Sequence, residues 1–323
     1  MQYSSYLGHE DQLSGVEEHR LIGGRGDGLR LLEVRNGLGL EVTVVPDRCA
    51  DLYRVAFLGQ NIGYFSSCGY VHPAHYDQEG AGFLKSFTAG FLTTCGLTAV
   101  GTPCEDDGER TRMHGTIGNT PAEHAWWHRE ADALVVEADV KDARLFGRKL
   151  QLHRRLEFST TENRLTLTDT VENHGDAESP LMVLYHMNMG YPLLSERAQV
   201  TIPSDRVTPR NAHAAGGLDT RLQMLPPQPG FEEQCYFHGF DRAGRAAIYN
   251  PELGIGLEIA FDPAQLPYLC QWKMLGVHDY VLGLEPGNCL PDGRKAMREQ
   301  ARLRFLAPGE QQQFQLQIRF WED

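Results

Sequence analysis

Two polar side chains interrupt an apolar stretch near the middle of the chain. Residues 181–194 read L-M-V-L-Y-H-M-N-M-G-Y-P-L-L, with His186 and Asn188 at the centre. Side chains two positions apart on a β-strand point to the same face, so this pair shares a face and its apolar neighbours point to the other. With Gly190 beside the pair and Pro192 ending the strand, the pattern predicts the floor of a pocket. The alternative is a buried histidine hydrogen-bonded to a backbone carbonyl.

A carboxylate lies at the end of a second apolar stretch, Y-V-L-G-L-E-P-G-N at residues 280–288. Glu285 shares a face with Val281 and Gly283 if this stretch is a strand. Burying a carboxylate is costly without a partner or a purpose, and partial burial raises its pKa toward the range of a general base near neutrality. The alternative is a surface glutamate where the strand ends.

Two further motifs could bind a ligand. His114 lies in M-H-G-T-I-G-N, where the adjacent glycine lets a ligand approach closely, although a solvent-exposed turn histidine fits the pattern equally well. Trp272 and Lys273 are neighbours in C-Q-W-K-M, and an aromatic ring beside a cation suits a sugar. A tryptophan in the hydrophobic core is the alternative there.

Other patterns offer less chemistry. His72, His75 and Asp77, and separately His124 and His128, have spacings that could chelate a metal, but neither set is completed at a diagnostic spacing. The chain contains no G-x-S-x-G elbow, phosphate loop or dinucleotide fingerprint. We therefore expect no metal and no cofactor. Histidine and glutamate without an obvious Ser or Cys nucleophile favour proton transfer over acyl transfer.

Strands must position these residues. Asn36-Gly37 between two strand-like runs, 29–35 and 38–45, predicts a hairpin, because both turn positions need positive φ. Alternating strand-like runs recur later, at 133–140, 149–158, 164–171, 245–249, 256–261 and 314–320. Residues 59–120 show weak periodicity and predict a long irregular segment of the functional kind. No helical period, repeat or linker is evident. The chain thus predicts an all-β fold, one large β-sandwich domain over residues 1–323 with residues 1–28 as an N-terminal arm.

Composition narrows the partners. The chain has 323 residues and a formal net charge of −13, which argues against nucleic acid and anionic membrane surfaces. Its seven scattered cysteines form no C-x-x-C pair, so no disulfide framework is expected. No apolar run approaches a membrane span and the N-terminus lacks a signal-peptide pattern, so we expect a cytoplasmic protein.

The order of the motifs resembles the aldose 1-epimerase (galactose mutarotase-like) superfamily, and more closely an uncharacterised branch of it. M-H-G-T-I-G-N, Y-H-M-N-M-G-Y-P and G-L-E-P-G-N follow the order of that family's binding histidine, catalytic histidine and catalytic glutamate. The L-A-P-G-E turn at Leu306 leads into a last alternating strand, as in that family. The similarity runs from about residue 30 to the end. It implies a β-supersandwich with an open cleft across one sheet.

The resemblance also implies roles. Glu285 would be the general base and His186 the general acid of an enzyme that interconverts the α and β anomers of an aldose without a cofactor. The expected sugar-binding residues are His114, Asn188, Trp272, Lys273 and His238. The chain departs from the family around the catalytic histidine, and the family's arginine-bearing G-R segment is replaced by L-T-T-C-G-L-T. The expected partner is a small-molecule sugar, and the sequence leaves a homodimer open.

Two alternatives remain at this point. The first is a sugar-binding protein or sensor that keeps the cleft without turnover. The second is a metal-assisted sugar isomerase or lyase on the same scaffold. This second function would use a metal or extra cations near the cleft, for which the H-P-A-H-Y-D stretch, Lys85, Arg110 and Arg112 are candidates.

Overall fold

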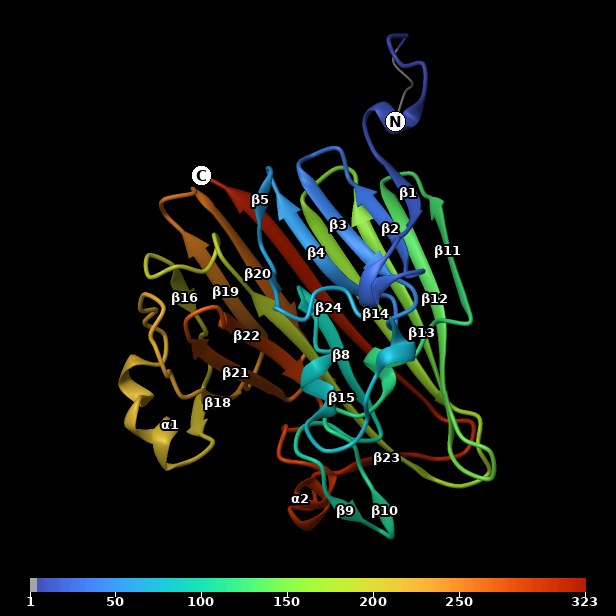
Figure 1. Cartoon of the computed structure of the whole chain (residues 1–323), viewed down its shortest axis with the longest axis vertical. Helices are drawn as coiled ribbons and strands as arrows, with labels where there is room; N and C mark the ends of the chain where they lie inside the picture. Colours follow the sequence, from blue (N-terminus) through green and yellow to red (C-terminus); the bar gives the residue numbers. More distant parts are fainter. Residues whose placement is uncertain (1–4) are drawn as a thin grey trace.

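The computed structural model describes residues 5–323, and most of their regular structure is β-strand (Figure 1). The two α-helices in this part of the chain are short: α1 (Ala212–Gly216) and α2 (Arg294–Glu299). Single 3-10 turns lie at Glu10–Gln12, Gly24–Gly26, Pro73–His75, Gly82–Lys85, Ile117–Asn119 and Leu218–Thr220. No helix within residues 5–323 is long and apolar enough to cross a membrane. The all-β prediction is confirmed.

The largest sheet has eight antiparallel strands. Their spatial order is β11 (His124–Arg129), β12 (Ala133–Ala143), β13 (Lys149–Ser159), β14 (Arg164–Asn173), β24 (Gln311–Glu322), β20 (Ile255–Phe261), β19 (Gly244–Asn250) and β16 (Gln199–Thr201). Buried and exposed side chains alternate along β24, as its sequence predicts. Because β24 pairs with both β14 and β20, the end of the chain joins strands from the middle and the C-terminal part into one sheet.

A second sheet carries the candidate site. It contains β17 (Arg206–Pro209), β18 (Gln234–Gly239), β21 (Tyr268–Leu275), β22 (Tyr280–Gly287), β15 (Ser179–Met189) and β23 (Arg304–Leu306), with β8 (Leu92–Leu97) also paired to β15. Strand β8 lies in the segment predicted to be irregular, and for these residues that prediction is wrong. All of its residues are buried, so the strand has no polar face that could produce an alternating pattern.

The third sheet is formed by the start of the chain. Its strands are β1 (Gly15–Arg20), β2 (Arg30–Arg35), β3 (Leu40–Val45), β4 (Asp51–Phe57) and β5 (Gln60–Asn61). A hairpin joins β2 and β3 as predicted, but its loop is longer than the predicted Asn36-Gly37 turn, and the positive φ values lie at Gly37 and Gly39. Strand β1 lies within the segment predicted as an N-terminal arm. The remaining short strands pair as β6 (Tyr64–Phe65) with β7 (Ala89–Gly90), and β9 (Glu105–Asp106) with β10 (Glu109–Arg110).

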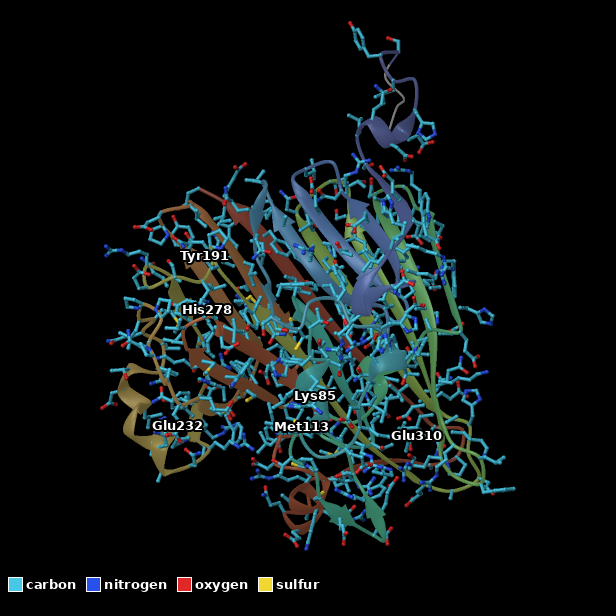
Figure 2. The ribbon with its side chains drawn as sticks, in the orientation of Figure 1. Lys85, Met113, Tyr191, Glu232, His278 and Glu310 are labelled. Atoms are coloured by element: carbon cyan, nitrogen blue, oxygen red, sulfur yellow. The ribbon has the colours of Figure 1, made fainter. Side chains whose placement is uncertain are left out.

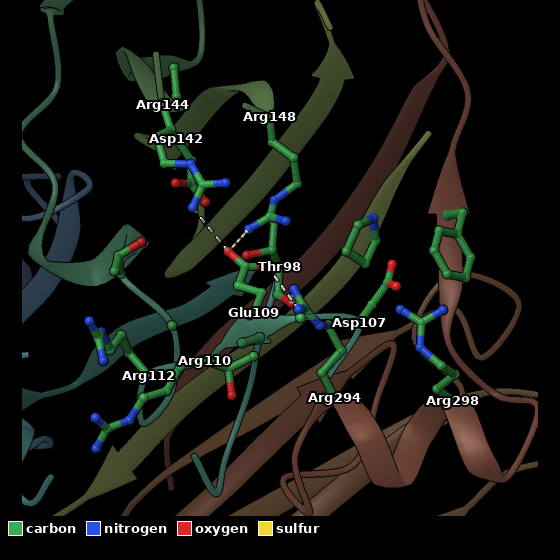
Figure 3. A pocket seen from close by; sticks show the side chains of 18 of the residues that line it. Thr98, Asp107, Glu109, Arg110, Arg112, Asp142, Arg144, Arg148, Arg294 and Arg298 are labelled. Carbon is green, nitrogen blue, oxygen red and sulfur yellow. Dashed lines mark hydrogen bonds and ion pairs between the residues drawn. The ribbon is translucent and has the colours of Figure 1, made fainter. Parts of the chain in front are cut away.

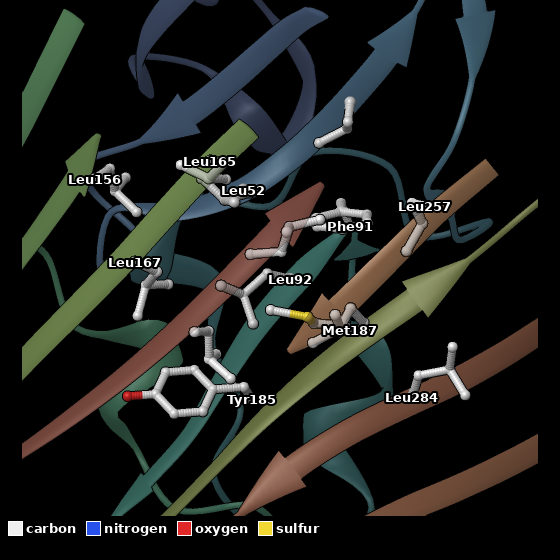
Figure 4. Packing of buried hydrophobic residues seen from close by; sticks show 14 of the residues in the cluster. Leu52, Phe91, Leu92, Leu156, Leu165, Leu167, Tyr185, Met187, Leu257 and Leu284 are labelled. Atoms are coloured by element: carbon white, nitrogen blue, oxygen red, sulfur yellow. The ribbon is translucent and has the colours of Figure 1, made fainter. Parts of the chain in front are cut away.

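One apolar core joins the three sheets (Figure 4). It includes Leu52 of β4, Leu167 of β14, Met187 of β15 and Leu257 of β20, all fully buried. Because side chains from every sheet meet in a single cluster, the eight-stranded sheet packs against the other two. This is the predicted sandwich.

A buried ionic network crosses this core. The Arg154 guanidinium donates to Asp169 from Nε and Nη2 at 2.9 and 2.8 Å, and to Asp51 from Nη1 at 2.7 Å. The Tyr185 hydroxyl donates to Asp169 Oδ2 at 2.9 Å. Removing one partner from a fully buried ion pair typically costs about 3–5 kcal/mol, because the other charge is left uncompensated. The network therefore fixes β15 relative to β4, β13 and β14.

Candidate active site

Strand pairing places His186 and Glu285 opposite each other. Leu184 pairs with Gly287 and Asn188 with Gly283 across β15 and β22, so the two residues midway between these pairs are His186 and Glu285. Their side chains share the face that points away from the core. His186 Nδ1 lies 3.3 Å from Glu285 Oε1. The two residues that sequence analysis selected for acid–base chemistry are thus in contact.

Both side chains are almost fully buried. The side chains are 8% and 2% exposed, and neither His186 Nδ1 nor Glu285 Oε1 has a hydrogen bond in the described part of the chain. Burial lowers the pKa of His186 to about 3, with a further contribution from nearby His114. Burial also raises the pKa of Glu285 well above its ordinary value, and Cys235 adds to this effect. Burial therefore favours the neutral imidazole and the protonated carboxyl.

Strand β21 extends the same face beside Glu285. Cys270 pairs with Glu285 and Trp272 with Gly283, so the Trp272 ring stands next to the acid–base pair. The Trp272 and His186 rings meet edge to face with centroids 5.3 Å apart. A Cβ atom at Gly283 would overlap the Glu285 carboxylate, so glycine is required at this position for the carboxylate to turn toward His186.

A loop brings His114 over the pair from the other side. Its backbone has φ 56°, and its amide donates to the Gly101 carbonyl at 3.0 Å. The imidazole packs on Phe83 with centroids 5.2 Å apart and lies edge to face with His186 at 5.5 Å. Burial lowers the pKa of His114 to about 4, and Arg210 contributes to the shift. His114 Nδ1 is buried without a hydrogen-bond partner in residues 5–323, so it is available to a ligand.

These side chains line a cavity of about 340 Å³, within the size range of small-molecule sites. Most of its wall is apolar or aromatic, and the polar groups converge around His186 and Glu285. Figure 2 places Met113, one of the lining residues, near the centre of the molecule. The lining residues are Phe83, Leu84, Phe87, Gly101, Thr102, Pro103, Met113, His114, His186, Arg210, Glu233, Cys235, Cys270, Trp272, Glu285 and Pro291.

Three of the predicted binding residues do not line this cavity. Asn188 is fully buried and donates to the carbonyls of Gly90 and His186 at 3.1 and 2.9 Å. Gly190 opens no space beside it, because a Cβ atom there would collide with the backbone of Tyr64. The backbone of Gly63 and Tyr64 covers the end of β15. Of the two polar residues on this strand, only His186 therefore lies at the floor of the pocket.

Lys273 and His238 point to the opposite face of the sheet. Lys273 Nζ donates to the Thr220 carbonyl at 3.0 Å, and burial lowers its pKa. His238 lies between Ser204 Oγ at 2.8 Å and Gln271 Oε1 at 3.1 Å, and burial lowers its pKa to about 4. Because Trp272 and Lys273 are consecutive on a strand, only one of them can face the cavity.

The sequence analysis did not select Arg210, Glu233, Phe83 and Phe87, which all line the cavity. Arg210 follows β17 and Glu233 precedes β18, while the two phenylalanines come from the loop that leads to β7. Single charged or aromatic residues at the ends of strands carry no pattern of their own. Their place depends on which strands pair.

A larger cavity of about 720 Å³ holds Arg110 and Arg112, the cations considered for a lyase (Figure 3). Its central carboxylate is Glu109, which accepts from Arg148 and from Arg294 at 2.8 Å. Burial alone would raise the pKa of Glu109, but these hydrogen bonds lower it to about 2. Arg110 and Arg112 both pair with Glu79, so these two cations are partnered away from His186 and Glu285.

The candidate metal ligands do not form a cluster. His72 Nδ1 accepts from the Ala74 amide at 3.1 Å, and Asp77 accepts from Lys85 at 3.4 Å. Within residues 5–323, no group of three or more His, Cys, Asp or Glu side chains is arranged to hold a metal ion.

A profile of the family described as "Domain of unknown function (DUF4432)" matches residues 26–320. The chain belongs to this DUF4432 family. No curated protein matches the sequence. The matched region contains the whole cavity.

Solved structures share the fold of this DUF4432 protein. A putative aldose 1-epimerase from Klebsiella pneumoniae superposes with a TM-score of 0.90 at 29% identity, over 97% of this chain and 86% of that one. A galactose mutarotase-like protein from Clostridium acetobutylicum gives 0.68 at 14% identity, over 97% and 100%. Galactose 1-epimerase from Lactobacillus acidophilus gives 0.63 at 14%, over 96% and 99%. The resemblance to the galactose mutarotase-like superfamily, in an uncharacterised branch, is confirmed.

Proposed function

We propose that this protein interconverts the α and β anomers of an aldose by acid–base opening of the sugar ring. The observation that carries the proposal is the contact of His186 Nδ1 with Glu285 Oε1 at 3.3 Å, in a cavity where neither atom has another hydrogen-bond partner among the described residues. The ring oxygen and the anomeric hydroxyl of an aldose are bonded to the same carbon. Two adjacent proton-transfer groups can therefore serve both oxygens from one side.

The reaction needs a single proton on the pair. In the ion-pair form, Glu285 takes the proton of the anomeric hydroxyl while protonated His186 gives its proton to the ring oxygen. The bond between the anomeric carbon and the ring oxygen breaks and a carbonyl forms. After rotation about the bond between carbons 1 and 2, the two transfers run in reverse and the ring closes on the other face. Positioned acid–base groups of this kind contribute about 10²–10⁴-fold to the rate.

The same proton count supports the opposite assignment. In the uncharged form, which burial favours, Glu285 carries the proton and donates it to the ring oxygen while neutral His186 accepts from the hydroxyl. The sequence-derived roles, Glu285 as base and His186 as acid, then apply to ring closure. Both forms return to their starting state after one cycle, so neither requires a cofactor.

The sugar would be held between the remaining walls. Trp272 offers a flat ring for the C–H face of a pyranose, and His114 Nδ1 offers an unused polar atom. We include these two residues as substrate-binding groups. Asn188, Lys273 and His238 are left out because the structure gives them other partners.

Exchange NMR tests the proposal directly. With the wild-type protein and a panel of free aldoses, saturation should transfer between the α and β anomeric signals of at least one sugar. Glu285→Gln should slow this exchange by at least about 100-fold while the sugar still binds. The control is Glu252→Gln, which changes an exposed carboxylate paired with Arg197. Sugar binding without exchange in the wild type would overturn the enzyme and favour a sugar sensor.

A further inference from the structure

We propose that the cavity selects an uncharged sugar, with Arg210 and Glu233 hydrogen-bonding to its hydroxyls. The inference rests on the proposed function and narrows its substrate class to aldoses without a phosphate or carboxylate group. It comes from two residues that line the cavity and take no part in the acid–base pair.

Arg210 is held firmly at the cavity wall. Its backbone amide donates to the Cys235 carbonyl at 3.0 Å. From the guanidinium, Nε donates to Asp292 at 3.2 Å, and Nη2 donates to Thr102 Oγ1 at 3.3 Å and to the Pro291 carbonyl at 3.5 Å. A guanidinium carries five N–H donors. The three contacts above and one to the Cys235 thiol leave at least one of these donors unused. A fixed side chain with a spare donor is suited to binding an oxygen of the substrate.

Glu233 supplies the complementary acceptor. Its Oε2 accepts from the indole Nε1 of Trp272 at 2.7 Å, which sets the orientation of the ring beside Glu285. Its Oε1 accepts no hydrogen bond within residues 5–323. A sugar hydroxyl both donates and accepts, so two neighbouring hydroxyls can bind to the arginine donor and to the carboxylate of Glu233, an exposed residue at the cavity wall. With the anomeric carbon at His186, the C–H face of the ring would lie on Trp272.

The charges around the cavity disfavour an anionic substrate. Arg210 is the one Lys or Arg among the lining residues, and Asp292 already pairs with it at 3.2 Å. Glu233 adds a further negative charge, while burial lowers the pKa values of His114 and His186 to about 4 and about 3, so neither imidazole carries a positive charge at neutral pH. The formal sum over Arg210, Asp292 and Glu233 is −1. A phosphate monoester carries about −1.5 to −2 at pH 7 and would enter this site against repulsion.

The test compares anomer exchange of free hexoses with exchange of the same hexose 6-phosphates. We expect kcat/KM to be at least about tenfold higher for the free sugar, which corresponds to about 1.4 kcal/mol. Glu233→Gln keeps an oxygen that can accept from the Trp272 indole and removes the negative charge. It should therefore lower the ratio of kcat/KM between the free sugar and its 6-phosphate several-fold. A merely structural role for Glu233 would lower both rates and leave the ratio unchanged.

Arg210→Met should raise KM for the free sugar about tenfold, because the sugar loses a hydrogen bond from a charged donor, and should change kcat less. Arg206→Met is the matched control, because Arg206 lies on β17 outside the cavity and pairs with Asp241. Equal or faster exchange of the 6-phosphates would overturn the inference and leave the epimerase standing.

If the wild type exchanges no sugar, the proposed function fails, and saturation-transfer difference spectra of the two sugar classes decide the inference. If the free sugar binds and Arg210→Met weakens this binding, the inference is supported. If only the sugar phosphate binds, or if neither sugar binds, the inference is overturned.

Discussion

The Tyr185 hydroxyl donates to Asp169 Oδ2 at 2.9 Å on the face of β15 opposite to His186. Tyr185 and His186 are consecutive, so the contact that holds one in the core also holds the other in the cavity. Asp169 also forms an ion pair with Arg154, and Arg154 forms a second ion pair with Asp51 on β4. The position of His186 therefore depends on a network whose residues do not line the cavity.

Replacing Tyr185 by phenylalanine tests this dependence. Tyr185→Phe removes one hydrogen bond to a buried carboxylate, and the free energy of unfolding in urea should fall by about 1.5–3 kcal/mol. Anomer exchange should persist, because Arg154 still binds Asp169. Tyr249→Phe is the control, since its hydroxyl bonds to Asp323 at the surface, and we expect no measurable change. Equal stability of the two variants would contradict a holding role for Tyr185.

His186→Ala should lower turnover more than it weakens sugar binding. In the proposed mechanism the imidazole transfers a proton in the transition state, so its loss should reduce kcat by about 10²–10⁴-fold with a small effect on the dissociation constant. Single-turnover exchange and a binding titration separate the two effects. A defect confined to binding would rule out the acid–base role.

The pH dependence of exchange reports the proton shared by His186 and Glu285. With ordinary pKa values of 6.5 and 4.5, the one-proton form would dominate only between these values. With His186 near 3 and Glu285 raised, the window extends downward toward pH 3 and upward to the pKa of Glu285. We expect kcat/KM not to fall as the pH is lowered from 5 to 4, and to fall on the alkaline side only as Glu285 ionises. A loss of half the activity near pH 4.5 would show that Glu285 and His186 titrate in their ordinary ranges.

Buried histidines should make the fold sensitive to acid. The pKa of His238 is about 4 in the folded protein against an ordinary 6.5, so the unfolded chain binds more protons between these values. Stability should fall as the pH drops through this window, by roughly 3 kcal/mol from this residue. His238→Gln should flatten the dependence in urea titrations from pH 7 to 4. The control His174→Gln, which changes an exposed histidine just after β14, should not. An unchanged slope in His238→Gln would refute the assignment.

Local sequence patterns predicted much of the fold. The alternation of apolar and polar residues marked β24 and the strands around it, and Asn36-Gly37 marked the first hairpin. The sequence analysis did not predict strand β8, because this strand is buried on both faces and its sequence shows no alternation of apolar and polar residues.

The candidate site was only partly readable. The motifs singled out His186, Glu285 and His114, which the structure brings together. The same approach grouped Lys273 with Trp272, although consecutive strand residues face opposite ways. Arg210 and Glu233 gave no signal, because each is a lone charged residue next to a strand.

The sequence alone thus determined the all-β class, the strand faces and which two residues, His186 and Glu285, are the candidates for acid–base chemistry, because side-chain alternation is a property of each strand by itself. Tertiary structure decided that His186 lies opposite Glu285, that Asn188 is covered, and which charged groups border the cavity. These outcomes depend on the register between β15 and the β21–β22 hairpin, and β15 is far from that hairpin in the chain. Register is set by packing in the shared core, and no single strand encodes it.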